Sequence, residues 1–113
     1  MYDEIDALEL EKLIKSNKEI EIIDVREDEE WDMIRIPNTK LIPLSNIVSR
    51  VDEIDFSKKV YIFCRSGYRS WQVCAWLDSK WKKATNVTWS IRQLYREKSD
   101  LIEITDKFYP WYF

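Results

Sequence analysis

The pattern of apolar and polar positions predicts strands and helices in alternation. The run Val60-Tyr61-Ile62-Phe63 is continuously apolar, which is typical of a central strand buried on both faces of a sheet. Further strands are predicted at residues 20–25, 40–42 and 87–89, and helices at residues 6–16, 27–33, 44–54, 70–80 and 90–98. Because strands alternate with helices, we expect an α/β fold with an open, mostly parallel sheet flanked by helices.

The sequence also predicts how individual helices begin and which segments are buried. Asp6 and Glu9 fit a capping box at the start of the first helix. The helix at 70–80 is apolar nearly all round, so we expect it to be covered on both sides. The acidic run at residues 27–30 is interpreted as a solvated helix start. Residues 101–113 receive no assignment, but their aromatic end is expected to pack back on the domain. The tryptophans expected in the core or at its rim are Trp31, Trp71, Trp76 and Trp81.

Length and composition favour one globular domain. The chain has 113 residues, of which 45% are hydrophobic and 35% charged, with no repeat and no linker. We therefore expect a single domain over residues 1–113, with residues 98–113 as an aromatic C-terminal extension. The net charge of -3 and the lack of a basic tract indicate no nucleic-acid partner. No apolar run predicts a signal peptide or a membrane span, so the cytoplasm is the expected location.

The residues that are missing exclude several chemistries. The chain has no histidine, which excludes Ser-His-Asp and Cys-His catalysis and histidine metal sites. Its one glycine, Gly67, cannot make a dinucleotide-binding or phosphate-binding glycine loop. Its two cysteines are too few for a zinc knuckle or a disulfide framework. We expect no metal and no organic cofactor, and chemistry that depends on a thiol, carboxylates, lysines or tyrosines.

A cysteine lies where such chemistry is expected. The segment Cys64-Arg65-Ser66-Gly67-Tyr68-Arg69 joins the buried strand to a helix, at the carboxyl end of the sheet where α/β folds place their sites. Gly67 permits backbone N–H groups to turn inward and hold an anion. A helix N-terminus and nearby arginines favour the thiolate of a cysteine. Cys64 is therefore predicted to be a reactive thiol, whereas Cys74, inside the apolar helix, is predicted to pack in the core.

Four motifs follow one another along the chain. They are Ile23-Asp24-Val25-Arg26, Glu29-Glu30-Trp31, Ile36-Pro37-Asn38-Thr39-Lys40-Leu41-Ile42-Pro43-Leu44 and Cys64-Arg65-Ser66-Gly67-Tyr68-Arg69-Ser70. In this order, from about residue 6 to residue 98, the chain resembles the rhodanese-like sulfurtransferases. The resemblance implies a five-stranded parallel sheet flanked by helices and a single-domain sulfurtransferase.

The resemblance also implies roles for the cysteine loop. Cys64 would take a sulfane sulfur from thiosulfate or a similar anionic donor and hold it as a persulfide, with the loop amides around the sulfur. Arg65 and Arg69 would attract the donor, and Ser66 and Tyr68 would donate hydrogen bonds to its oxygens. The sulfur would pass to a thiol, to cyanide or to a protein acceptor.

Other positions depart from the family or support the loop. The family's Gly-His is replaced by Ile34-Arg35, and Arg35 is interpreted as solvated. Asn38 replaces a glycine and is expected to tolerate left-handed geometry. The stretch at 77–86 is longer than usual and lacks the family's glycine. Asp24 and Arg26 end a strand near the predicted site, where we expect a salt bridge or loop anchor.

Two other functions stay open. Some phosphatases and arsenate reductases of this fold place five residues between cysteine and arginine, whereas four separate Cys64 from Arg69. A tighter loop fits one sulfur atom better than a tetrahedral phosphate. The third possibility is a non-enzymatic sulfur carrier or interaction module, which the missing glycines and the aromatic tail keep open.

Overall fold

Strands and helices alternate along residues 2–113, which the computed structural model describes. The strands are β1 (Asp3–Asp6), β2 (Ile20–Asp24), β3 (Ile34–Arg35), β4 (Lys40–Leu41), β5 (Lys59–Phe63), β6 (Thr85–Thr88) and β7 (Glu103–Ile104). The α-helices are α1 (Ala7–Lys15), α2 (Asp28–Met33), α3 (Ile47–Arg50), α4 (Tyr68–Ser79) and α5 (Ser90–Arg96). Short 3-10 turns occupy η1 (Leu44–Asn46), η2 (Val51–Glu53) and η3 (Pro110–Tyr112).

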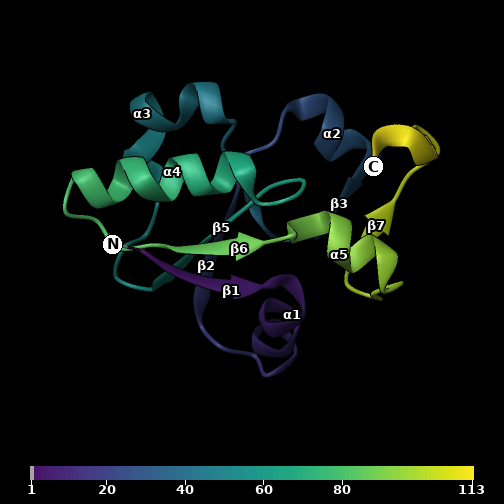
Figure 1. Cartoon of the computed structure of the whole chain (residues 1–113), viewed down its shortest axis with the longest axis horizontal. Coiled ribbons are helices and arrows are strands. Elements are labelled where there is room, and N and C mark those ends of the chain that lie inside the picture. Colours follow the sequence, from purple (N-terminus) through teal and green to yellow (C-terminus); the bar gives the residue numbers. More distant parts are fainter. Residues whose placement is uncertain (1) are drawn as a thin grey trace.

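A five-stranded parallel sheet organises the fold, as predicted. Its strand order is β1-β6-β5-β2-β4, so the apolar strand β5 is central. Helices α3 and α4 cover one face of the sheet, and α1 and α5 lie on the other (Figure 1). The expected α/β class is confirmed, and the carboxyl ends of the strands meet at one edge of the sheet.

Side chains of β5 alternate between the two faces, because successive residues of a strand point in opposite directions. Val60 and Ile62 join the buried cluster beneath α3 and α4. Tyr61 and Phe63 join the cluster beneath α1 and α5. Cys64 continues the first set, so the end of β5 directs it toward the start of α4.

Two expectations about the helices are wrong, one about the extent of a helix and one about its burial. The single helix predicted at 44–54 is wrong, because η1, α3 and η2 replace it. This segment is rich in β-branched and short polar residues, which are poor helix formers. The expectation that α4 is covered on both sides is also wrong. Val73, Cys74 and Leu77 are buried on one face, whereas Trp71 is 44% exposed, because α4 lies in an outer layer.

One strand of the five-stranded sheet, β1, and both strands of the small sheet, β3 and β7, escaped the sequence analysis. The acidic segment Asp3–Asp6 has the composition of a poor strand, yet it forms β1 and pairs in parallel with β6. Asp6 then caps α1, since its carboxylate accepts the Glu9 N–H at 2.8 Å, as half of the expected capping box. Tertiary pairing at the sheet edge therefore overrides local strand preference.

The C-terminal segment packs back on the domain, as expected. Strand β7 pairs antiparallel with β3 and forms a second, two-stranded sheet. Rings at the end of the chain pack on Tyr95, with Phe113 stacked at a centroid distance of 4.9 Å and Phe108 tilted at 5.2 Å. Tyr112 is only 8% exposed. The tail thereby becomes part of the cluster beneath α1 and α5.

Left-handed backbone occurs at one glycine and at several larger residues. Gly67 has φ +102°, and Asn38 has φ +68°, which confirms the expected left-handed geometry at Asn38. The other residues of this kind are Asn17, Trp81, Trp89, Ser90 and Lys98. Trp81 follows the end of α4, where glycine commonly ends a helix, and it is 97% exposed. Its expected place in the core is therefore wrong.

Arg35 is not simply solvated, contrary to expectation. Its guanidinium forms an ion pair with Glu103 and donates to the Trp31 carbonyl at 3.0 Å. These contacts join β3, β7 and α2. Among residues 2–113, we find no helix whose length and apolar character would let it cross a membrane.

Candidate active site

The Cys64 sulfur lies in a cradle of hydrogen-bond donors at the start of α4. The N–H of Gly67 is 3.1 Å from Sγ, and the N–H of Ser70 is 3.4 Å away. The Ser70 hydroxyl lies 3.3 Å from the same sulfur. Backbone donors at a helix N-terminus stabilise negative charge. The cradle can therefore hold an anionic sulfur without a histidine.

The geometry of Gly67 depends on its lack of a side chain. Its φ of +102° is rarely adopted by other residues, and a Cβ there would lie 3.2 Å from the Trp89 backbone nitrogen. The Gly67 carbonyl accepts the Trp71 N–H at 3.1 Å and the Asn86 amide at 3.4 Å. The conformation that turns the Gly67 N–H toward sulfur is therefore fixed from both α4 and β6.

The other side of Cys64 is held by the start of α5. The Cys64 N–H donates to the Ser90 hydroxyl at 3.1 Å, and that hydroxyl donates to the Val87 carbonyl at 2.6 Å. The Cys64 carbonyl accepts the Ile91 N–H at 3.2 Å. Both backbone groups of the cysteine are thus satisfied within the fold, and its orientation is defined.

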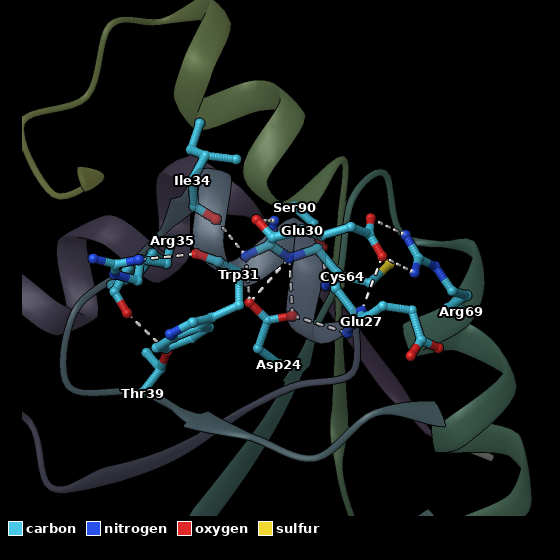
Figure 2. Close-up of polar contacts among 12 residues, drawn as sticks. Asp24, Glu27, Glu30, Trp31, Ile34, Arg35, Thr39, Cys64, Arg69 and Ser90 are labelled. Atoms are coloured by element: carbon cyan, nitrogen blue, oxygen red, sulfur yellow. Dashed lines mark hydrogen bonds and ion pairs between the residues drawn. The ribbon is translucent and has the colours of Figure 1, made fainter. Parts of the chain in front are cut away.

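Arg69 is paired with a carboxylate from α2. Its two terminal nitrogens donate to Glu30 at 2.6 and 2.8 Å, and Figure 2 shows the guanidinium and carboxylate turned toward one another. Hydrogen bonding to Glu30 raises the pKa of Arg69 above its ordinary value, and the charge of Cys64 acts in the same direction. Arg69 is therefore a permanent cation under the electrostatic influence of the sulfur.

The expectation that the acidic run at residues 27–30 is solvated is wrong for Glu30. Its carboxylate accepts the Glu27 N–H at 2.9 Å and the Tyr112 hydroxyl at 2.5 Å, besides the bonds from Arg69. Burial alone would raise the pKa of Glu30, but these hydrogen bonds outweigh it and lower the pKa to about 2. The preceding acids are exposed, whereas Glu30 faces the site.

Arg65 and Tyr68 lie differently in the loop. The Arg65 guanidinium lies over the Tyr112 ring, 5.4 Å from its centre, and its buried Nε has no hydrogen-bond partner among the described residues. Tyr68 is 66% exposed and stacks on Trp71 at 6.0 Å. Ser66 is half-buried in the loop. The loop therefore presents one arginine at the aromatic tail and one tyrosine to solvent.

Asp24 and Arg26 form the expected ion pair. Both are fully buried, and the Arg26 guanidinium contacts the Asp24 carboxylate at 2.8 Å. Arg26 also donates to the Ile34 carbonyl at 2.7 Å and to the Tyr112 hydroxyl at 3.3 Å. Burial opposes the charge of Arg26, but Asp24 outweighs it and raises the pKa of Arg26. This pair anchors the end of β2 beneath the site.

The second cysteine has a different environment. Cys74 is fully buried in the cluster beneath α3 and α4, and both cysteines are free thiols. Burial, together with the charges of Glu4 and Cys64, raises the pKa of Cys74 to about 12. Cys74 is therefore a neutral core residue, as its apolar surroundings in the sequence predicted.

Access to Cys64 is restricted. The residue is only 1% exposed, so its side chain is almost completely shielded from solvent. A hollow of about 470 Å³ lies near the amino ends of β5 and β6, beside Phe56, Lys59 and Trp81. Because it is at the opposite end of the sheet from Cys64, we do not assign it to the sulfur chemistry.

Comparison with known proteins agrees with this geometry. Residues 6–104 match the family model described as the rhodanese-like domain. The chain belongs to the rhodanese-like domain family. A rhodanese-like domain protein from Staphylococcus aureus aligns over 92% of this chain and 99% of its own, with 32% identity and a TM-score of 0.77.

The names of two relatives indicate the class of reaction. The provisionally named sulfurtransferase YtwF of Bacillus subtilis strain 168 is 38% identical over 74% of this chain and 82% of its own length. A sulfurtransferase of Allochromatium vinosum is 35% identical over 68% of this chain and 72% of its own. This rhodanese-like domain is thus of the sulfurtransferase type.

Sequence reasoning found part of the site and missed four residues. The structure brings Cys64 and the Gly67 amide together and places Arg69 nearby. The missed residues that contact this group are Glu30, Ser70, Ser90 and Tyr112. Glu30 and Ser70 stood within the quoted motifs, whereas Ser90 and Tyr112 are distant in sequence and gave no local signal.

Proposed function

We propose that this domain moves a sulfane sulfur from thiosulfate, or a similar anionic donor, to a thiophilic acceptor through a persulfide on Cys64. The observation that carries the proposal is the convergence of the Gly67 N–H, the Ser70 N–H and the Ser70 hydroxyl on one sulfur. Donors directed at a position where charge develops favour an anionic nucleophile and an anionic product.

The first half-reaction forms the persulfide. The Cys64 thiolate attacks the outer sulfur of thiosulfate, and a new sulfur–sulfur bond forms. The sulfur–sulfur bond of thiosulfate breaks, and its electron pair leaves with sulfite. The persulfide on Cys64 then carries the negative charge, and the Gly67 and Ser70 N–H groups that contact Sγ favour an anion there.

The second half-reaction restores the enzyme. An acceptor thiolate or cyanide attacks the terminal sulfur, the persulfide bond breaks, and its electron pair returns to Cys64 as the thiolate. Because sulfite leaves before the acceptor reacts, the two substrates obey ping-pong kinetics.

A sulfur-carrier role is the second candidate. The provisionally named sulfur carrier protein YrkF of Bacillus subtilis is 32% identical over 79% of this chain and 49% of its own length. In this role the persulfide would form on Cys64 but pass only to a protein partner.

The test measures thiocyanate formed from thiosulfate and cyanide. We expect activity from the wild type, none from Cys64→Ser, and retained activity from Cys74→Ala, which removes the other thiol. Mass spectrometry after thiosulfate alone should find one added sulfur atom on the Cys64 peptide. Wild-type activity no higher than that of Cys64→Ser would contradict the proposal that the domain is an enzyme. An adduct that transfers only to protein thiols would favour the carrier, and Cys64-dependent hydrolysis of an aryl phosphate would favour a phosphatase.

A further inference from the structure

The C-terminal tail brings Tyr112 to the cysteine loop. The family match ends at residue 104, so Tyr112 lies outside it. Its ring packs against Phe113 at 4.7 Å, and the Phe113 ring in turn stacks on Tyr95. The Thr105 N–H donates to the Met33 carbonyl at 2.9 Å and so attaches the tail to α2. The position of the Tyr112 hydroxyl is therefore set by packing.

The direction of each hydrogen bond at this hydroxyl is determined. Arg26 can only donate, so the Tyr112 oxygen accepts its bond at 3.3 Å. Glu30 is ionised above its pKa of about 2, so its carboxylate accepts a hydrogen bond from the Tyr112 hydroxyl, with 2.5 Å between the two oxygens. Burial, assisted by Glu30, raises the pKa of Tyr112 and keeps this proton in place. The hydroxyl consequently stabilises the Glu30 charge.

Tyr112 contacts Arg65 of the loop directly and is linked to Arg69 through Glu30. Its ring lies beneath the Arg65 guanidinium, and its hydroxyl orients the carboxylate that holds Arg69 through two bonds. Arg69 interacts electrostatically with Cys64. The aromatic tail therefore influences where positive charge lies around the sulfur.

We propose that Tyr112 is a positioning residue that acts through Glu30 to favour anionic reagents at Cys64. The Tyr112 hydroxyl disperses the negative charge of Glu30 and fixes Arg69, so an anion approaching Cys64 meets less repulsion. Only the identity of the anion, thiosulfate, rests on the proposed function.

The test compares two reagents that alkylate a thiol with the same leaving group, iodoacetate, which is anionic, and iodoacetamide, which is neutral. Rates are measured on the Cys64 peptide by mass spectrometry. Tyr112→Phe retains the ring and removes the hydroxyl, and we expect it to lower the iodoacetate-to-iodoacetamide rate ratio by about three- to tenfold. The KM for thiosulfate should rise by a similar factor, while kcat changes less. Tyr109→Phe, in the same tail, is the matched control and should leave both quantities unchanged.

A double-mutant cycle separates positioning from general packing. In a Glu30→Gln background, adding Tyr112→Phe should change neither the rate ratio nor KM, because the charge on which the hydroxyl acts is gone. An unchanged ratio in Tyr112→Phe, or an equal loss with and without Glu30→Gln, overturns the proposal. If the ratio falls as expected but the wild type forms no persulfide, the proposed function fails and the role of Tyr112 stands.

Discussion

The backbone N–H of Cys64 donates to the hydroxyl of Ser90 across 3.1 Å, although 26 positions separate the two residues. Ser90 is fully buried and also donates to the Val87 carbonyl. Ser90→Ala leaves both backbone groups without this partner, and we expect it to lower the free energy of unfolding by about 1–3 kcal/mol. Urea unfolding measures this loss, with the exposed Ser45→Ala as control. Equal midpoints for the two variants would contradict the bracing role of Ser90.

Gly67→Ala should damage both stability and sulfur transfer. The added Cβ would lie 3.2 Å from the Trp89 nitrogen and 3.3 Å from Thr88 Cα, at a φ of +102°. Left-handed strain of this kind costs about 1–3 kcal/mol, and relief of the strain turns the Gly67 N–H away from sulfur. We expect a lower melting temperature and a loss of thiocyanate formation. Asn38→Gly, at a left-handed position outside the loop, is the control and should retain activity.

The buried ion pair should be far more sensitive than an exposed one. Asp24→Asn leaves the fully buried Arg26 charge without its carboxylate, which costs about 3–5 kcal/mol in comparable cases. Glu53→Gln breaks the solvent-exposed pair with Arg50 and should barely change the urea midpoint. Similar losses in both variants would mean that the Asp24–Arg26 pair does not anchor the site.

Glu30 should make stability depend on pH in the acid range. Its pKa is lowered from 4.5 to about 2 in the fold, so its contribution is fully present above about pH 4.5 and disappears as pH falls toward 2. The shift corresponds to a contribution on the order of 3 kcal/mol. Urea unfolding of the wild type and Glu30→Gln should therefore give stabilities that converge between pH 5 and pH 2. A constant difference across that range would show that Glu30 is not the titrating group.

The sequence predicted those features that depend on local pattern. The continuous apolar run at Val60–Phe63 indicated the central strand, and the glycine after Cys64 indicated inward-facing amides. Both signals are contained within a few residues. Parallel pairing of β1 was not predictable, because acidic residues at Asp3–Asp6 are poor strand formers and only the neighbouring β6 stabilises them.

The parts of the site that were missed depend on tertiary contacts. Glu30 resembled its exposed acidic neighbours, and only the position of Arg69 distinguishes it. Tyr112 is 82 positions from Glu30, so its role depends on how the tail returns along α2. Trp81 illustrates the opposite error, since an apolar residue near a buried helix was expected inside but lies in solvent.

The use of left-handed backbone has a practical consequence for engineering. The sole glycine contacts the Cys64 sulfur through its N–H, while Trp81 and Lys98 adopt positive φ without the flexibility of glycine. Glycine at either position would remove a steric penalty that each bulky residue now carries. Variants with a higher melting temperature can thus be sought at Trp81 and Lys98, without changing the loop around Cys64.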